Sequence, residues 1–403
     1  MKILQLIPKA PFPLHDGGAI AAWNLTRGMS MNGCSVTVLA MNTDKHFTNM
    51  RDLPQWMQET CNWISVDVNT SVRPFKALFN LLFSRTPYIL QRFRSNRYAA
   101  ALKELLINEK FDLVQCEGLQ TAIYIPLIRK YSGSVMIAYR AHNIESEIWQ
   151  RKAKREKRRL YHYLFTVMAE RLQNLEDKLI NRYDLLIPIT GRDAEVFRLM
   201  GNQKPSCTIP SGFNTDMMPE ITPPSNILSI GYIGSLDWTP NQEGLLWFLE
   251  KVWKPLTSKP GYVKLHVAGR NAPPWLEKIL FGTYDLIYEG EVEEAQTFMM
   301  EHPILVVPLF TGSGMRVKIV EGMALGRIII STPVGVEGLP VTNNKDILVA
   351  TNAREYQDII AAVIANPQDY AHIAEAARML VLEKFNNLAL GKSLVDFYSD
   401  NLK

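Results

Sequence analysis

Short apolar runs alternate along this chain with longer stretches in which apolar residues recur every three or four positions. The short runs are typical of buried strands, and the longer stretches are typical of helices with one apolar face. Residues 304–308 form the clearest run, and residues 315–325 have apolar side chains every fourth position. Residues 311–314, with the sequence TGSG, lie between them. The pattern therefore predicts a strand, a glycine-rich loop and a helix, in that order.

The same alternation of strand and helix runs twice through the chain, and residues 202–226, which are rich in Pro, Ser and Asn, interrupt it. Two such runs predict an α/β protein made of two doubly wound domains, with a ligand in the cleft between them. We expect an amino-terminal domain at 1–205, a linker at 206–226 and a second domain at 227–385, with a last helix at 386–403 packing back on the first domain. The expected strands are 2–7, 35–41, 63–68, 111–116, 134–139, 184–189, 228–233, 263–268, 285–288, 304–307, 327–331 and 347–350. The expected helices are 19–31, 75–83, 98–108, 119–131, 144–182, 192–200, 241–252, 293–301, 313–325, 353–365, 370–384 and 387–401.

Composition and charge narrow the class of protein. The chain has 403 residues, 47% of them apolar and 21% charged, with a net charge of +4, which is typical of a soluble globular protein. Seven basic side chains and one acidic side chain fall within residues 151–159. The basicity is thus one local patch, which argues against general affinity for nucleic acids.

Cysteines and apolar runs indicate the compartment. The four cysteines are far apart and form no Cys-x-x-Cys pair, so we expect reduced thiols in a cytosolic protein and no zinc site. The chain starts with a strand rather than a secretory signal. Its apolar runs are far shorter than the roughly 20 residues of a membrane span. We therefore expect a cytoplasmic protein that meets a membrane, if at all, at the inner surface. The cysteines are Cys34, Cys61, Cys116 and Cys207.

The glycine-rich loop before residue 315 is a candidate anion site. Such a loop exposes backbone N–H groups at the positive end of a helix dipole. Arg316 and Lys318 add two cations near the helix start, where a cation is normally unfavourable, so a bound phosphate would remove a conflict. Glu321 follows Lys318 by about one turn and can accept hydrogen bonds from sugar hydroxyls. The alternative is an ordinary strand–helix unit with surface charges.

Two candidate positions in the first half follow predicted strands. Gly17-Gly18 comes after the first strand, where ligands bind in open α/β sheets. The loop lacks the Gly-x-Gly-x-x-Gly spacing of dinucleotide sites, and a plain connecting turn is the alternative. His142, Asn143 and Glu145 follow the strand expected at 134–139 and are interpreted as a second ligand-binding group, although a single His is more often structural.

The basic patch is flanked by Trp149, Tyr161 and Tyr163. Cations beside interfacial aromatic residues are typical of a contact with an anionic membrane surface. We therefore expect residues 149–163 to be a membrane-contact candidate, with a solvated helix face as the alternative. The apolar helix expected at 75–83 is a second candidate for such a contact.

Taken together, the two α/β halves and their glycine loops resemble the GT-B glycosyltransferases, and specifically glycosyltransferase family four, over the whole length of the chain. The strongest match is residues 312–324 with Gly326, residues 331–332 and residues 335–338. The segments that resemble family motifs are Gly17-Gly18, His142-Asn143-Ile144-Glu145, Ile209-Pro210-Ser211-Gly212, Gly234-Ser235 with Pro240-Asn241, Ala268-Gly269-Arg270 and Gly290-Glu291-Val292.

The resemblance implies two facing Rossmann-like domains and retaining sugar transfer from a nucleoside diphosphate sugar to a glycan or lipid-linked acceptor, as in polysaccharide biosynthesis. One departure is Ser313, where many relatives have a glutamate eight positions before the one matched by Glu321. By the resemblance, the catalytic residues are His142, Arg316 and Lys318. The donor-binding residues are Gly17, Gly18, Gly234, Ser235, Asn241, Gly269, Arg270, Val292, Gly312, Ser313, Gly314, Met315 and Glu321.

Metal and cofactor requirements follow from the same residues. The chain has no Asp-x-Asp sequence, so we expect the diphosphate to be bound by cations and loop amides without a metal, and we expect no cofactor and no nucleic-acid partner. Two alternatives stay open. One is a nucleotide-sugar epimerase of the same fold, which would need an additional acid and base near the sugar. The other is a non-catalytic nucleotide-sugar-binding protein. Only the missing carboxylate at Ser313 supports this alternative.

Overall fold

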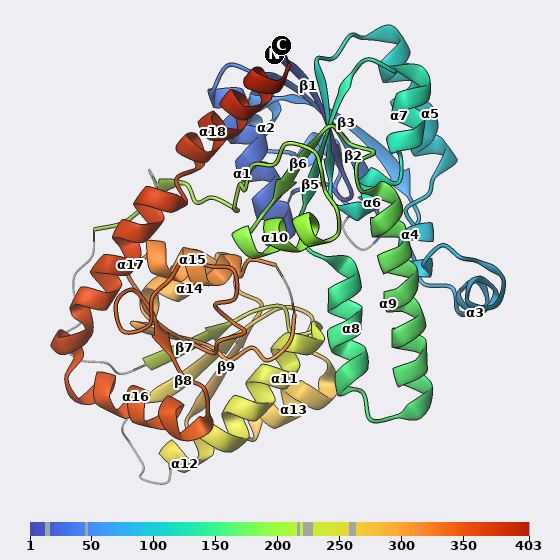
Figure 1. The fold of residues 1–403 in the computed structure, drawn as a ribbon. Helices are drawn as coiled ribbons and strands as arrows, with labels where there is room; N and C mark the ends of the chain where they lie inside the picture. Colours follow the sequence, from blue (N-terminus) through green and yellow to red (C-terminus); the bar gives the residue numbers. More distant parts are fainter. Residues whose placement is uncertain are drawn as a thin grey trace. The chain divides into compact units, whose positions relative to one another are not determined.

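The chain forms two compact units, one made of Met1–Gly212 with Asn387–Lys403 and the other of Phe213–Asn386. The computed structural model describes residues 1–12, 17–44, 47–215, 218–220, 229–257, 263–312 and 314–402. Each unit contains one six-stranded sheet in which every pair of neighbouring strands is parallel. The expected fold class, two doubly wound α/β domains, is confirmed (Figure 1).

Unit 1 has the strand order β3-β2-β1-β4-β5-β6. Alternate residues of its strands feed two apolar clusters, one on each face of the sheet, as expected for a parallel sheet covered on both sides. Leu4 of β1 belongs to the cluster under α5, α7 and α9, and Ile3 belongs to the cluster under α1 and α18. The elements are β1 Lys2–Ile7, α1 Gly17–Met31, β2 Ser35–Thr43, η1 Met50–Asp52, α2 Gln55–Thr60, β3 Asn62–Val68, α3 Pro74–Phe83, α4 Tyr88–Gln91, α5 Asn96–Asn108, β4 Leu113–Glu117, α6 Leu119–Ala122, α7 Ile125–Tyr131, β5 Met136–Ala141, α8 Glu145–Arg155, α9 Arg159–Leu179, β6 Leu185–Pro188, α10 Gly191–Leu199 and α18 Asn387–Asn401.

Unit 2 has the strand order β12-β11-β10-β7-β8-β9. Its two faces are again covered by separate clusters, one that includes α11, α13 and α16 and one that includes α15 and α17. The elements are β7 Ser229–Ile233, α11 Thr239–Phe248, η3 Leu249–Trp253, α12 Lys254–Leu256, β8 Lys264–Ala268, α13 Pro274–Phe281, β9 Leu286–Gly290, α14 Ala295–Glu301, β10 Ile304–Val307, α15 Val317–Ala324, β11 Ile328–Ser331, β12 Leu348–Val349, α16 Ala353–Ala365, η4 Pro367–Tyr370 and α17 Ala371–Lys384.

The long helix expected at 144–182 is wrong in one respect, because it is two helices, α8 and α9. The backbone is extended at Glu156 and Arg158, which end one helix and begin the next. Arg158 turns back on Glu156, to which both its backbone N–H and its guanidinium donate. Folding back also packs Trp149 of α8 edge-on against Phe165 of α9, with ring centroids 5.6 Å apart. A single straight helix would have left these two aromatic side chains apart.

The helix expected at 313–325 begins later, at Val317. Gly312 and Gly314 have positive φ angles of 109° and 76°, a conformation that interrupts a right-handed helix and favours glycine. The glycine-rich loop is therefore longer than expected, Arg316 precedes the helix, and Lys318 is its second residue. The helix expected at 119–131 is likewise two short helices, α6 and α7, and the one expected at 241–252 ends at Phe248 and continues as a π-helical turn.

None of the helices in the described ranges combines the length and the apolar character that crossing a bilayer requires.

Candidate functional site

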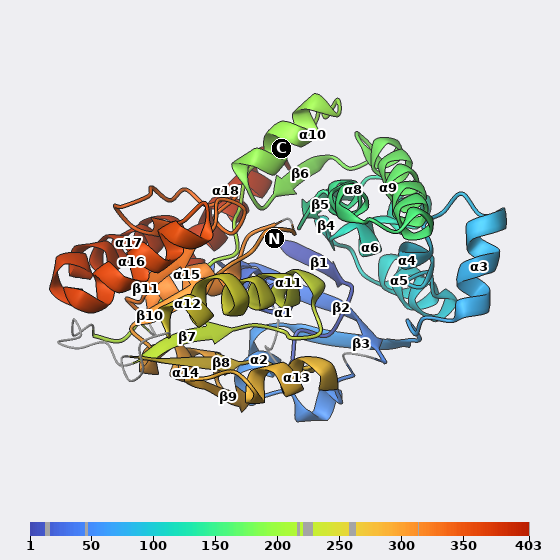
Figure 2. The ribbon, with the colours of Figure 1, turned by 90° about the horizontal axis from the view of Figure 1, so that it is seen from below.

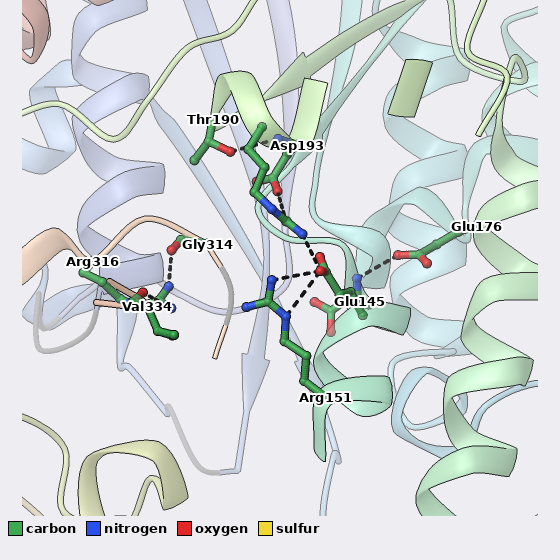
Figure 3. Close-up of polar contacts among 10 residues, drawn as sticks. Glu145, Arg151, Glu176, Thr190, Asp193, Gly314, Arg316 and Val334 are labelled. Atoms are coloured by element: carbon green, nitrogen blue, oxygen red, sulfur yellow. Dashed lines mark hydrogen bonds and ion pairs between the residues drawn. The ribbon is translucent and has the colours of Figure 1, made fainter. Parts of the chain in front are cut away.

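The glycine-rich loop of unit 2 is held by the arginine at its end. The guanidinium of Arg316 donates to the carbonyl of Gly314, as Figure 3 shows, and to the carbonyl of Val334 at 3.5 Å. Arg316 is only 5% exposed. A side-chain Cβ at Gly312 would lie 3.3 Å from the indole of Trp238 and 3.4 Å from the guanidinium of Arg316. The predicted cation therefore lies within the loop and shapes it.

Lys318 sits at the start of α15 and reaches the end of β7. Its Nζ donates to the carbonyl of Ile233 at 2.9 Å and to Oδ1 of Asn241 at 3.1 Å. The amino group also lies 5.2 Å from the ring centroid of Tyr232. Burial, and to a smaller extent the charge of Arg316, lowers the pKa of Lys318 to about 7. A bound anion would stabilise this ammonium, because its acceptors are neutral.

The turn after β7 brings further predicted residues to Lys318. Asn241 donates to the carbonyl of Ser235 at 2.9 Å, and Nε of Arg270 donates to the hydroxyl of Ser235 at 3.2 Å. A Cβ at Gly234 would lie 2.7 Å from Nδ2 of Asn241 and 2.9 Å from Nζ of Lys318. Only glycine lets these polar groups approach the backbone so closely.

Gly269, at the end of the neighbouring strand β8, also allows a close approach to the backbone. A Cβ there would lie 2.1 Å from the carbonyl oxygen of Gly234. The structure therefore brings Gly234, Ser235, Asn241, Gly269, Arg270 and Lys318 together at the carboxyl end of β7 and β8, the edge where ligands bind in open α/β sheets.

Glu321 lies one turn after Lys318 on α15 and is 8% exposed. Burial raises its pKa from the ordinary value near 4.5 to about 7. Its carboxylate forms no hydrogen bond with a side chain or N–H group of any residue that the structure describes. Met315 and Val292 are half-buried, and within the described part of the chain neither forms a hydrogen bond with Lys318. Ser313 lies outside the described residues.

Unit 1 contains a cavity of about 660 Å³ at the carboxyl end of its sheet. Gly18, His142, Asn143 and Glu145, all predicted site residues, line this cavity. Gly17 is the first residue of α1. Lys9, Thr43, Arg92, Phe93 and Glu117 are among the other residues that line it. The volume falls within the range of small-molecule sites.

His142 is paired with a buried carboxylate in this cavity. Its Nε2 lies 2.5 Å from Oε2 of Glu117, at the end of the neighbouring strand β4, and Arg140 lies 3.5 Å from the same oxygen. Burial alone would raise the pKa of Glu117, but Arg140, His142 and Gln5 outweigh it and lower the pKa. An ionised carboxylate only accepts hydrogen bonds, so Nε2 of His142 donates. Nδ1 is then the imidazole nitrogen left to accept a proton or a hydrogen bond from a ligand hydroxyl.

Buried amides support Glu117 from behind. Gln5 donates to Oε1 of Glu117 at 2.9 Å, and Gln115 donates to the same oxygen. The hydroxyl of Thr26 on α1 donates to Gln5 at 2.6 Å, and the hydroxyl of Tyr398 on α18 donates to Gln115 at 2.7 Å. Two helices far apart in sequence therefore fix the carboxylate that orients His142.

Glu145 completes the polar lining of the cavity at the start of α8. Burial raises its pKa, against hydrogen bonds from Asn143 and Gln120. The backbone N–H of Glu145 donates to Oε1 of Glu176 at 2.8 Å, as Figure 3 shows. Burial also raises the pKa of Glu176 to about 7, although N–H groups of the helix start donate to it. Glu176 thus anchors the turn that carries His142 to Glu145.

Glu117 and Arg140 are the functional candidates that sequence reasoning missed. Both are completely buried, and they lie opposite each other in the register of β4 and β5. The sequence did contain a signal, because Glu117 ends a strand and is followed directly by a glycine, Gly118. The structure shows why glycine is there, since its φ is 74°. Recognising it requires knowing that β4 and β5 are neighbours.

Comparison with known proteins was made for the whole chain. A model described as Glycosyltransferase Family 4 matches residues 15–217, and one described as Glycosyl transferases group 1 matches residues 228–366. A Klebsiella pneumoniae protein described as an uncharacterized 44.6 kDa protein in the cps region is 22% identical, covering 98% of each chain.

Solved structures resemble the fold over its full length. Sucrose-phosphate synthase from Thermosynechococcus elongatus superposes with a TM-score of 0.74 at 15% identity, over 99% of each chain. Anabaena HepE, determined with UDP, superposes with a TM-score of 0.70 at 15% identity, over 99% of this chain and 100% of HepE. A second HepE structure, with UDP-glucose, has a TM-score of 0.67 at 14% identity, over 99% and 100% of the two chains.

Proposed function

This chain belongs to glycosyltransferase family 4 and has the GT-B fold, and from that premise we propose that it transfers a hexose, with retention at the anomeric carbon, from a nucleoside diphosphate sugar to a glycan or lipid-linked acceptor. Unit 2 binds the donor in this proposal, and the cavity of unit 1 binds the acceptor. The HepE structures with UDP and UDP-glucose support a nucleotide-sugar donor by analogy.

The observation that carries the proposal is the environment of Lys318. Its amino group donates to two neutral acceptors of the described chain, Ile233 O and Asn241 Oδ1, and Arg316 lies nearby. Two cations and the start of a helix concentrate positive potential where a leaving diphosphate gains charge. We infer that Arg316 and Lys318, with the loop amides, stabilise that charge without a metal ion.

In the proposed reaction, unit 1 positions the reacting groups and does not bond covalently to them. In the proposed reaction the bond between the anomeric carbon and the diphosphate oxygen breaks, and a bond to the acceptor hydroxyl oxygen forms. The hydroxyl proton leaves toward the diphosphate. His142, oriented by Glu117, accepts a hydrogen bond from the transferred sugar or the acceptor through Nδ1 and fixes its position.

Incubation with a panel of radiolabelled nucleotide sugars tests the activity. Donor hydrolysis or transfer supports a glycosyltransferase, interconversion of the sugar would identify an epimerase, and binding without turnover would identify a binding protein. Lys318→Ala should lower turnover at least about a hundredfold, the usual effect of losing a well-placed donor to developing charge. Lys264→Ala, an exposed lysine of the same unit, is the matched control. Equal turnover in both variants would contradict the assigned role of Lys318.

We further propose that the acceptor is lipid-linked and that α3 contacts an anionic membrane surface. Its apolar side chains face outward, with Phe75 89% and Phe83 73% exposed. Arg171 of α9 donates to the backbone carbonyls of Asn80 and Leu81 in the last turn of α3 and so ties this helix to α9. Figures 1 and 2 both show α3 on the outer side of unit 1, beside α9. An amphipathic helix with large exposed apolar residues is typical of interfacial binding.

The basic patch contributes fewer free cations than its sequence indicates. Arg151 pairs with Glu147, Arg158 pairs with Glu156, and the ammonium of Lys152 lies 4.6 Å from the ring centroid of Phe165. Lys154, Lys157 and Arg159 are exposed. Each cation near an anionic surface contributes roughly 1 kcal/mol, and the contribution falls off within a Debye length.

Co-sedimentation with phosphatidylglycerol and phosphatidylcholine vesicles tests the membrane contact. Replacing Phe79 and Phe83 by Ser should release the protein from both kinds of vesicle. Replacing Lys154, Lys157 and Arg159 by Gln should weaken binding to the anionic vesicles at low salt only. Phe281→Ser, which removes a 74% exposed aromatic side chain of unit 2, is the control. Unchanged sedimentation of the Phe79/Phe83 variant would favour an acceptor without a lipid anchor.

A further inference from the structure

Three metal-ligating side chains meet on one face of the sheet of unit 2. His266 comes from β8, Glu289 from β9, and His302 from the residues between α14 and β10. Nδ1 of His266 lies 2.6 Å from Oε1 of Glu289, and one ligand atom from each residue lies within 4.8 Å of the other two. The two imidazole rings are 4.4 Å apart between centroids. This is the one such group among the described residues.

The parallel register explains why these side chains converge. Gly231 of β7 lies opposite His266, and His266 lies opposite Ile287, two residues before Glu289. These positions share a face of the sheet. A Cβ at Gly231 would lie 2.9 Å from Cβ and 3.0 Å from Cδ2 of His302. The missing side chain at Gly231 is therefore what lets His302 lie over the sheet beside His266.

The hydrogen bonds around His302 determine which of its ring nitrogens carries the proton. Its Nδ1 lies 2.9 Å from the hydroxyl of Ser229, and that hydroxyl donates to the carbonyl of Glu301 at 3.4 Å. Ser229 therefore accepts from Nδ1–H, which leaves the lone pair on Nε2. Metal-binding histidines are commonly oriented in this way, by a hydrogen bond from the second ring nitrogen.

Nε2 of His302 is buried and has no hydrogen-bond partner among the described residues, and His302 is 3% exposed. A buried polar atom in that condition carries an energetic cost that native proteins usually avoid. A metal ion bound at the Nε2 lone pair would supply the missing partner.

We propose that His266, Glu289 and His302 form a binding site for a zinc ion, or for another divalent transition metal that prefers nitrogen and oxygen ligands. Two imidazoles and a carboxylate are a ligand set that zinc prefers, with water in the fourth position. Ligand atoms bound to zinc at about 2.0–2.1 Å lie about 3.4 Å apart. His266 and Glu289, now 2.6 Å apart, would therefore separate slightly, and any ligand atoms that lie farther apart, up to 4.8 Å, would approach each other. The proton shared by His266 and Glu289 leaves to solvent when the metal binds.

The site is structural in this proposal and independent of the proposed function. His302 precedes β10, whereas the glycine-rich loop with Gly312 follows the same strand. The metal would join the edge strand β9, which is paired with β8 through a register irregularity, to the connection that leads into β10. Its expected effect is therefore on the stability of unit 2.

The test uses the full-length, tag-free protein, stripped of metal by a chelator and dialysed. Titration with Zn²⁺ in a calorimeter should show one ion bound per chain, and melting should shift upward by at least a few degrees. Co²⁺ in place of zinc should give the visible d–d absorption of a site with nitrogen and oxygen ligands. Glu289→Gln, a change on an exposed side chain, should weaken zinc binding at least tenfold, and His302→Ala should abolish it.

His372→Ala, a change at an exposed histidine of the same unit, is the matched control and should bind zinc like the unmodified protein. Circular dichroism establishes that each variant is folded. Two results would overturn the proposal: no stoichiometric zinc binding, or equal binding by Glu289→Gln and the unmodified protein. A cobalt spectrum with thiolate charge-transfer bands would also overturn it, because it would place the metal on cysteines of unit 1.

Discussion

Two residues of the proposed donor site in unit 2, Lys318 and Glu321, are ionisable side chains at positions where burial disfavours their charged forms. Lys318 and Glu321 both have a pKa moved to about 7, one downward and one upward, chiefly through burial. Such shifts cluster at functional sites, because a ligand can return the interactions that water provided. Without a ligand, burying these two charges lowers the free energy of unfolding, so the stability of the protein should depend on pH.

Glu321→Gln should separate function from folding. The fold favours the protonated carboxyl, so stability contributed by Glu321 is complete below pH 4.5 and is lost as the pH rises through about 7. The Gln variant should therefore melt a few degrees above the unmodified protein at pH 8 and should match it near pH 4.5. Its affinity for the nucleoside diphosphate should fall by a factor of about 10–100, the effect of losing a charge-assisted hydrogen bond.

Thermal melts at the two pH values and calorimetric titration with the nucleotide give both readouts. Unchanged nucleotide affinity together with a lower melting temperature at pH 8 would make Glu321 a purely structural residue.

Glu117→Gln should change the orientation and tautomer of His142 without emptying the cavity. An amide has the shape of the carboxylate, but it can donate as well as accept, so Nε2–H of His142 loses its fixed acceptor. We expect turnover to fall about 10- to 100-fold with the donor affinity unchanged, because the proposed donor site lies in unit 2. Steady-state kinetics with calorimetry of the nucleotide measure this. A loss of donor affinity equal to the loss of turnover would contradict the positioning role.

At the scale of elements, α18 belongs to unit 1 and packs on α1 through two glycines. A Cβ at Gly391 would lie 2.6 Å from Cα of Gly28, and a Cβ at Gly28 would lie 2.9 Å from the carbonyl of Asn387. The helices approach closely enough there that only glycine fits. Tyr398, on the same helix, then reaches the buried amide that supports Glu117.

Gly391→Ala should destabilise unit 1 by about 2 kcal/mol, because the added methyl group meets backbone atoms that cannot rotate away. The melting temperature should fall by several degrees. Gly191→Ala is the matched control, since that helical glycine has open space around its Cβ position, and it should be neutral or slightly stabilising. Differential scanning fluorimetry compares the two, and equal melting temperatures would show that the contact of α1 with α18 is loose.

At the scale of the whole molecule, the two units carry separate parts of the proposed reaction, and unit 2 also carries the proposed zinc site. The donor loops present Lys318 and Arg316, and the proposed zinc site uses His266, Glu289 and His302 on another part of unit 2. Removal of metal should therefore affect stability and turnover differently.

EDTA should leave transfer at 25 °C nearly unchanged while lowering the melting temperature of zinc-loaded protein. The diphosphate is bound by cations in the proposed mechanism, so no divalent ion is needed for turnover. Activity and melting curves recorded on the same chelator-treated sample measure both effects. Complete loss of transfer that magnesium or manganese restores would show that a metal acts at the diphosphate.

The sequence alone was sufficient for the fold class and for many elements. Apolar periodicity and glycine positions are local properties, so the two runs of strand and helix and the loop around Gly312 could be predicted from them. The start of α15 and the break between α8 and α9 were misjudged. Positive φ at Gly314 and the return of Arg158 to Glu156 depend on contacts that a helical period does not contain.

The sequence predicted several residues of the candidate site but not the contacts between them. His142, Lys318 and Glu321 stood out because each follows a strand or a glycine loop. Glu117 did not, because it meets His142 from the next strand of the sheet. Asn241 was expected to bind the donor, but its hydrogen bond with Lys318, from 77 positions away, was not foreseen.

Only the tertiary structure decided these pairings and the charges that go with them. A parallel register aligns the ends of strands that are distant in sequence, and packing then removes water from whatever side chains lie there. The group of His266, Glu289 and His302 is the clearest case. Its members show no metal-ligand spacing along the chain and include no cysteine, so the sequence pattern does not indicate them. They become neighbours only because β8, β9 and β10 lie in one sheet with a glycine at position 231.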